Sequence, residues 1–221
     1  MKKLLCLAIA AIFTSATFAQ SEKYTKAMEA MVPAIDTTRS SDGLKELSNT
    51  FSRIADAEKT QWLPYYYAAL AQINSGYMYV QTKDVMSGGL GSVLDPIADK
   101  AESLLNKADA LSKDNSEIYV VKKMIASLRM MADPMSRYMT YGPQAAEALE
   151  TAKKLNPDNP RIYYLEGQDK LFTPEQFGGS KTEAKKLFEE ALKKYDAFKL
   201  QSSIQPQWGR GSTEYLLTQA Q

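Results

Sequence analysis

The chain has 221 residues, of which 44% are hydrophobic and 24% charged, and its formal net charge at pH 7 is +1. A nearly neutral chain has no electrostatic reason to bind nucleic acid or another highly charged surface, so no nucleic-acid partner is expected. The sequence holds no histidine and one cysteine, Cys6, which excludes a histidine base and an internal disulfide.

Residues 1–19 have the layout of a secretory signal peptide. Lys2 and Lys3 precede the apolar run LLCLAIAAIF, the small-residue stretch TSATFA follows it, and cleavage is expected after Ala19. Ten apolar residues reach only about 15 Å as a helix, roughly half a bilayer core, so a membrane anchor is disfavoured. We therefore expect an exported mature chain, periplasmic or extracellular, without a transmembrane segment.

Helix signals follow one another along the rest of the chain, and no period-two alternation indicates a strand. Pro96, Pro143 and Pro160 are each expected at the first position of a helix, and Ser180-Lys-Thr-Glu183 is a capping box. The expected helices, in chain order, span 22–38, 43–58, 62–82, 96–111, 116–132, 143–155, 160–171 and 181–198. They form a helical domain, 20–199, followed by a tail, 200–221, whose short helix and Trp208 are expected to cap the end of the stack.

A repeated spacing of small and bulky residues runs through these helices. Positions i, i+4 and i+7 share one helix face, so a small residue at each end lets a neighbouring helix approach the bulky residue between them. Two segments, LSKDNSEIYVVKK and LNPDNPRIYYLEG, also align without gaps at an offset of 44 residues. The triplets are Ala101, Leu105 and Ala108; Ala145, Leu149 and Ala152; Ala184, Phe188 and Ala191; and a weaker one, Leu47, Phe51 and Ile54.

These residues resemble the tetratricopeptide repeat (TPR) family, whose unit is a helix-turn-helix. Tyr163 and Gly167 match the aromatic and small positions of its first helix, and Pro157 matches its closing proline, whereas Lys123 stands where a small residue is expected. The resemblance implies an all-α solenoid of about four antiparallel hairpins with extended loops inside the hairpins. The stretch TPEQFGG is similar to turns in exported TPR proteins of Bacteroidetes-type bacteria.

The same resemblance implies a concave groove lined by the first helix of each hairpin. Its lining is apolar and aromatic, which suits an extended peptide, a helix, or an apolar small molecule or sugar. The alternative is that the tail or an insertion already fills it. The expected groove residues are Tyr66, Leu70, Asn74, Val120, Met124, Leu128, Tyr164, Gln168 and Phe172.

Other candidate sites have simpler structural explanations. Gly178 and Gly179 precede a helix and suit an anion loop, but no phosphate-loop pattern follows, so a hinge is favoured. The methionines around Met135 and Met139 suit a copper site, but pliable packing is favoured without histidine or cysteine. No catalytic residue, metal or cofactor is therefore expected.

Two functions stay open. The first is a non-enzymatic TPR scaffold that binds an unidentified envelope protein or peptide through the groove. The alternative is a small-molecule or sugar-binding protein, a transport accessory, that uses the same groove. An enzyme is not expected, and the pattern leaves the oligomeric state open.

Overall fold

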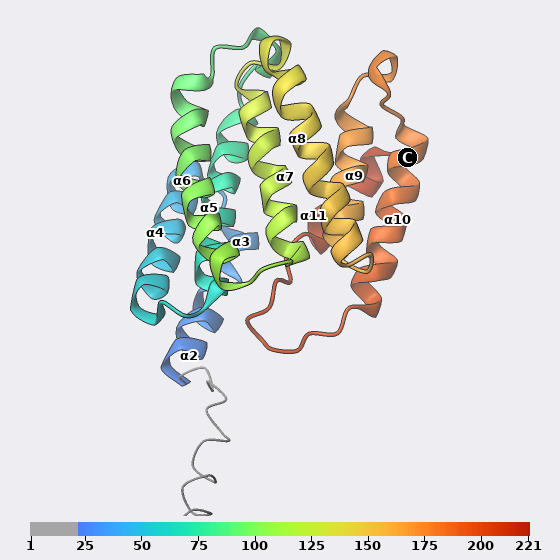
Figure 1. Ribbon diagram of the computed structural model, residues 1–221. Helices are drawn as coiled ribbons and strands as arrows, with labels where there is room; N and C mark the ends of the chain where they lie inside the picture. Colours follow the sequence, from blue (N-terminus) through green and yellow to red (C-terminus); the bar gives the residue numbers. More distant parts are fainter. Residues whose placement is uncertain (1–21) are drawn as a thin grey trace, which may run out of the picture.

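The computed structural model describes residues 22–221, and every regular element in that range is helical, which confirms the all-α prediction (Figure 1). The predicted signal peptide, 1–19, lies outside the described residues. The elements are α2 (Glu22–Met31), α3 (Ala34–Thr37), α4 (Ser41–Glu58), α5 (Trp62–Val80), the 3₁₀ turn η1 (Val85–Ser87), α6 (Gly91–Leu111), α7 (Ser116–Met131), α8 (Pro134–Leu155), α9 (Pro160–Phe172), the 3₁₀ turn η2 (Glu175–Phe177), α10 (Lys181–Ala197) and α11 (Arg210–Gln219).

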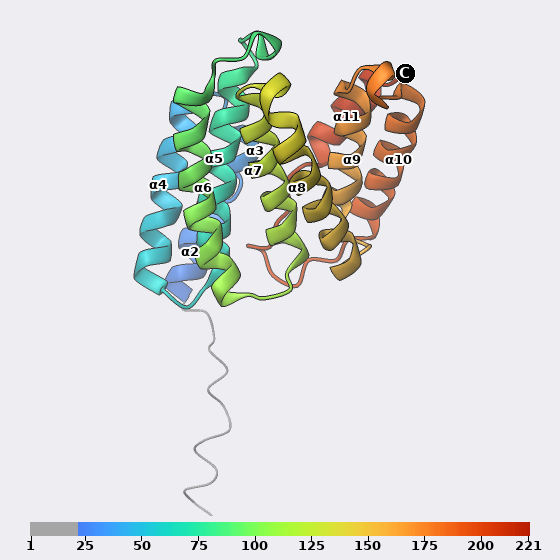
Figure 2. The same ribbon diagram turned by 45° about the horizontal axis from the view of Figure 1, so that its top comes forward.

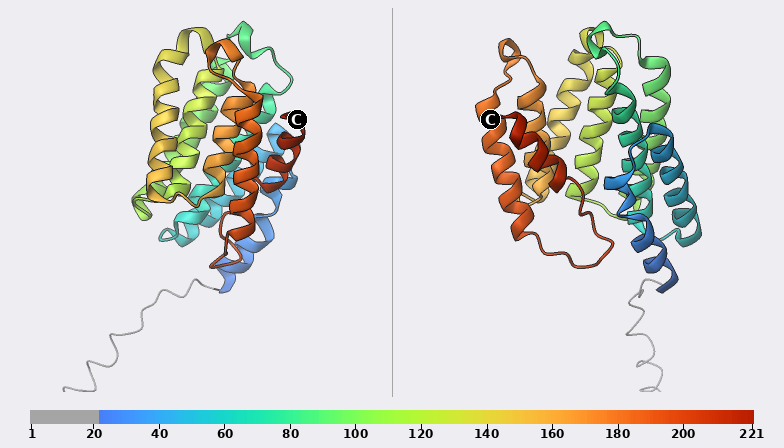
Figure 3. Two further views of the ribbon diagram at one scale, coloured as in Figure 1. Left: turned by 90° about the vertical axis from the view of Figure 1, so that its right-hand side faces the viewer. Right: turned by 180° about the vertical axis from the view of Figure 1, so that it is seen from behind.

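Helices α4 to α10 run up and down beside one another (Figures 1 and 2). We call α5, α7 and α9 the inner layer. Helices α4, α6 and α8 pack on one side of it, and α10 packs on α9. Helices α2, α3 and α11, with the tail segment 198–209, lie on the other side (Figure 3). The inner layer is therefore covered on both sides.

The composition of α5 explains its central place. The helix WLPYYYAALAQINSGYMYV carries no charged residue, and its buried side chains occur all around its axis. A helix that is apolar all round is stable only when neighbours surround it. Gly76 lets α7 come close, because a Cβ added there would lie 2.6 Å from a methyl carbon of Leu128.

The small-bulky-small triplets are buried, as predicted. Ala184, Phe188 and Ala191 of α10 have no exposed surface, and the triplets of α6 and α8 are also buried. Gly167 shows why the facing position must be small, because a Cβ there would lie 2.5 Å from the Phe188 ring. The predicted phase of the helix faces is therefore confirmed.

Two predicted helix starts are wrong, and one predicted helix is interrupted. Helix α8 begins at Pro134, not 143, because Asp133 caps it by accepting from Ser136 N at 3.4 Å. Pro143 then lies inside the helix, as Pro96 does in α6. Both prolines are exposed, so water can reach the carbonyls whose hydrogen bonds they remove. The predicted helix 22–38 is interrupted at Pro33.

The paired glycines before α10 form a hinge, as favoured from the sequence. Gly178 has φ +93°, in the left-handed region that glycine tolerates best. A Cβ at Gly179 would lie 1.7 Å from the Thr173 carbonyl oxygen, so only glycine fits there. Ser180 then accepts from Glu183 N at 3.2 Å, as the predicted capping box requires.

Candidate functional site

The predicted groove residues lie in the inner layer, but most of them are not available to a ligand. Asn74 and Gln168 are half-buried, and Phe172 alone of the nine is exposed. The buried members are Tyr66, Leu70, Val120, Met124, Leu128 and Tyr164. The structure therefore brings the nine positions onto one layer, where six are buried, two are half-buried and one is exposed.

The tail covers the lower part of this layer, as the alternative interpretation of the groove anticipated. Trp208 Nε1 donates to Tyr66 Oη at 2.8 Å, and its ring meets the Tyr164 ring edge-on with centroids 6.3 Å apart. Tyr67 Oη donates to the Ile204 carbonyl oxygen at 3.0 Å. The tail is thus part of the core at this place.

A buried ion pair, which sequence reasoning missed, fixes the tail there. Arg161 of α9 is fully buried and donates to Glu117 Oε1 of α7 at 2.9 Å. It also donates to the Pro206 carbonyl oxygen, and the Trp208 ring centroid lies 5.3 Å from its Cζ. Asn159 Nδ2 donates to the same Glu117 oxygen at 2.9 Å. We call this set the clasp.

Arg161 of the clasp keeps its positive charge. Burial, the largest single influence, would lower the pKa of Arg161, but the Glu117 carboxylate together with the neighbouring tyrosines outweighs it and the pKa of Arg161 is raised. A signal for the pair was present in the sequence, because Glu117 and Arg161 are equivalent positions of the two segments aligned at an offset of 44. Opposite charges at one repeat position of adjacent hairpins indicate a contact between them.

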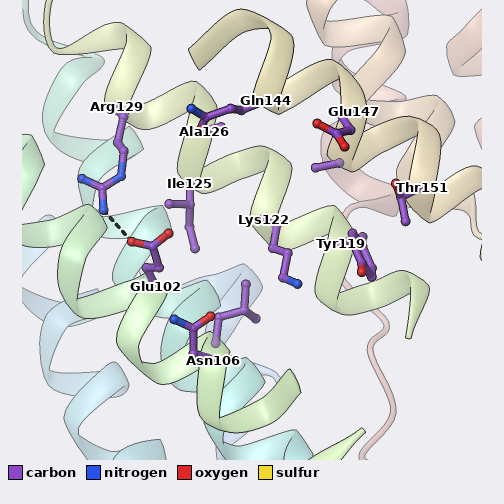
Figure 4. A pocket seen from close by; sticks show the side chains of 12 residues that line it. Glu102, Asn106, Tyr119, Lys122, Ile125, Ala126, Arg129, Gln144, Glu147 and Thr151 are labelled. Carbon is purple, nitrogen blue, oxygen red and sulfur yellow. Dashed lines mark hydrogen bonds and ion pairs between the residues drawn. The ribbon is translucent and has the colours of Figure 1, made fainter. Parts of the chain in front are cut away.

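A polar cleft lies on the opposite face, between α6, α7 and α8 (Figure 4). It holds about 250 Å³, and Glu102, Lys122, Arg129 and Glu147 line it. Arg129 binds Glu102 at 2.9 Å, while Lys122 binds Asp109 at 3.1 Å. Because these cations are already paired with carboxylates, the cleft offers a ligand little unsatisfied charge.

Exposed apolar side chains occur elsewhere, in and beside the α5–α6, α7–α8 and α9–α10 turns. These turns lie at one edge of the molecule (Figures 1 and 2). We call this the turn edge. Six of the ten large apolar side chains that are exposed in the described chain belong to it. They are Met86, Met135 (79% exposed), Tyr138 (60%), Met139 (81%), Phe172 (67%) and Phe177 (73%). Such a concentration of exposed apolar surface usually marks a binding site.

Pliable packing accounts for only part of the methionine cluster. Met124 is buried, as expected of a packing residue, but Met135 and Met139 project into solvent. The hydrophobicity of a methionine does not show whether its side chain is buried, because that depends on where α8 begins. Within residues 22–221, no group of three or more histidine, cysteine, aspartate or glutamate side chains is placed to hold a metal ion.

The exposed apolar side chains of the turn edge make it the candidate binding site. No protein-family model matches the chain, and no curated protein matches it either. A solved structure does: the HusA haemophore from Porphyromonas gingivalis is 34% identical, with a TM-score of 0.77. The match covers 91% of this chain and 94% of that protein.

The chain therefore belongs to the family of this haemophore. The neighbour comes from a Bacteroidetes bacterium, in agreement with the resemblance seen in the sequence, whereas membership of the TPR family stays a prediction. Among the described helices, none combines the length and the apolar character needed to cross a membrane.

Proposed function

We propose that the mature chain binds haem and carries it outside the cytoplasm. The observation that supports this most is the 34% identity to a haemophore over nearly the whole of both chains. A haemophore is a binding protein and not an enzyme. The family relation thus favours the small-molecule alternative over the protein-interaction scaffold, which was the first of the two functions expected from the sequence.

The chain contains side chains of the kinds that bind haem in proteins. Haem is a flat apolar macrocycle with an iron centre and two carboxylates. The sequence has no histidine, so imidazole cannot ligate the iron, but it has ten methionines and thirteen tyrosines. Thioether and phenolate groups are both used by proteins as haem ligands. Exposed members of both kinds lie on the turn edge.

Export rests on the predicted signal peptide, which would deliver the chain as residues 20–221. A haem carrier is useful only where it meets free haem, so an exported location agrees with the proposed cargo. Fractionation of cells producing the full chain, with a cytoplasmic and a periplasmic marker followed in parallel, tests the location. Finding the uncleaved chain only with the cytoplasmic marker would contradict export.

Titration of residues 20–221 with haemin tests the binding itself. We expect a saturable change in the haem absorbance band at a ratio near one, with a dissociation constant in the micromolar range or tighter. Bound haem should then pass to added apomyoglobin, as expected of a carrier. A small helical protein without known ligands serves as the control. Absorbance that rises without saturation, as in the control, would refute haem binding.

A further inference from the structure

We propose that the haem lies on the turn edge of the molecule, against the α8 stripe formed by Met135, Tyr138 and Met139. This inference rests on the proposed function, and it assigns the cargo to a surface other than the predicted concave groove. The neighbouring turns, which carry Met86, Phe172 and Phe177, would extend the contact on either side. The polar cleft between α6, α7 and α8 plays no part in it.

The α8 stripe is an apolar helix face without a partner. Its three residues are spaced i, i+3 and i+4, so their side chains project from one face of α8. In a helix that only packed against its neighbours this spacing would face the core, but each of the three is more than half exposed. The core face of α8 begins further along, at Ala145. Exposing this stripe is unfavourable unless a ligand covers it.

The same stretch of helix is held firmly from its other side. Arg137 makes a bidentate ion pair with Asp95 of α6, with N–O distances of 2.5 and 2.9 Å. It also donates to the Arg129 carbonyl oxygen at 3.2 Å, and Leu90 N donates to the Ala132 carbonyl oxygen at 3.0 Å. The stripe is thus a fixed platform, and binding a flat ligand there costs little ordering of the helix.

The α9–α10 turn supplies aromatic rings at the same edge. Phe172 ends α9 and Phe177 lies in η2, and both rings are exposed. The Gly178–Gly179 hinge sets the turn, and Lys170 Nζ anchors it by donating to the Gly178 carbonyl oxygen at 3.2 Å. Rings held in this way suit stacking on another flat π-system.

The charges near the turn edge suit the two carboxylates of a porphyrin. Lys83 follows α5 and Lys181 begins α10, so both lie at this edge, and both are exposed. In the part of the chain that the structure describes, neither of them is in an ion pair. Lys83 rests over the Tyr79 ring, 5.1 Å from its centroid, and leaves its ammonium free for an anion. The turn edge thus carries an apolar stripe and exposed cations, which matches an amphiphilic dianion.

Haemin titration of three variants tests the assignment. Met135→Ser, Tyr138→Ser and Met139→Ser combined should weaken haemin binding at least about tenfold, because most of the apolar contact is lost. Lys83→Ala with Lys181→Ala should weaken it less, about two- to fivefold, and this loss should shrink as salt is added. The matched control is Leu111→Ser with Tyr215→Ser, which removes exposed apolar side chains away from the turn edge and should change nothing.

Helical circular dichroism of each variant shows that the fold is kept, since all these side chains are exposed. If the wild type binds haemin and the α8 variant binds equally well, the haem lies elsewhere and the assignment is wrong. A loss confined to Phe172→Ser with Phe177→Ser would also overturn it.

If the wild type is a dimer and the α8 variant a monomer with unchanged affinity, the stripe is a self-association surface. A wild type that does not bind haemin refutes the proposed function instead.

Discussion

Arg161→Met should destabilise the fold strongly, because it removes one half of the clasp. The substitution deletes the donors to Glu117 and to the Pro206 carbonyl oxygen, and it leaves the mostly buried carboxylate without its cation. Removing one partner of a buried pair typically costs about 3–5 kcal/mol. Arg161 Nε is itself buried without a partner, so the wild-type pair is imperfect and we expect the lower end, about 3 kcal/mol.

A second substitution separates the effect of charge from that of packing. Glu117→Gln, added to Arg161→Met, removes the unpaired charge and keeps one oxygen, which can accept from either Tyr66 or Asn159, the donors to the two different oxygens of the carboxylate. We expect it to recover about 1–2 kcal/mol of the loss. Arg210→Met is the matched control, because Arg210 pairs with Asp196 at 2.7 Å on the surface and should contribute less than about 1 kcal/mol.

Urea unfolding followed by circular dichroism, with comparison of the slopes, measures these differences. The reasoning would be refuted if Arg161→Met cost no more than Arg210→Met. It would also be refuted if the double variant were less stable than Arg161→Met alone, because the carboxylate would then stabilise the fold without its cation.

Three further predictions concern packing and pH. Gly167→Ala should cost about 1–3 kcal/mol by clashing with the Phe188 ring, whereas Gly211→Ala, where a Cβ meets open space, should be neutral or slightly stabilising in the same unfolding assay; equal effects would contradict the described close approach of α9 and α10. Trp208→Ala should cost about 3–5 kcal/mol and make the preceding tail segment the first site of limited proteolysis, and an unchanged cleavage pattern would contradict a docked tail. Burial raises the pKa of Tyr164 to about 12, so the neutral phenol is favoured in the folded state. Its contribution should be fully present below about pH 10 and lost as the pH rises towards 12, seen as tyrosinate absorbance appearing together with unfolding; ordinary titration near pH 10 with the fold intact would argue against its burial.

The sequence was sufficient to predict the helix faces because those depend on neighbouring positions along the chain. The spacing of Ala184, Phe188 and Ala191 predicted their burial, and the structure agrees. The start of α8 was mistaken because two acceptable signals compete: Asp133-Pro134 and Gly142-Pro143 both suit a helix start. Solvent exposure of Pro143 lets the helix run through it, and exposure depends on the fold rather than on local pattern.

The candidate site was harder to predict for the same reason. Repeat phase placed Tyr66 on the inner layer correctly, but whether that layer is open depends on Trp208, which is 142 positions away in sequence. The local pattern contains no information about such a contact. Likewise, Met135 and Met139 look like packing residues in sequence, and only the position of α8 relative to its neighbours reveals that they meet none.

The docked tail has a consequence for the order in which the molecule is made. Tyr66 is synthesised early, yet its indole partner arrives only after all the helices from α5 to α10 have left the ribosome. Until Trp208 is made, the Tyr66 hydroxyl lacks this partner. If the chain is exported as proposed, this late contact would leave the chain open to transport through a secretion pore until its synthesis is nearly complete.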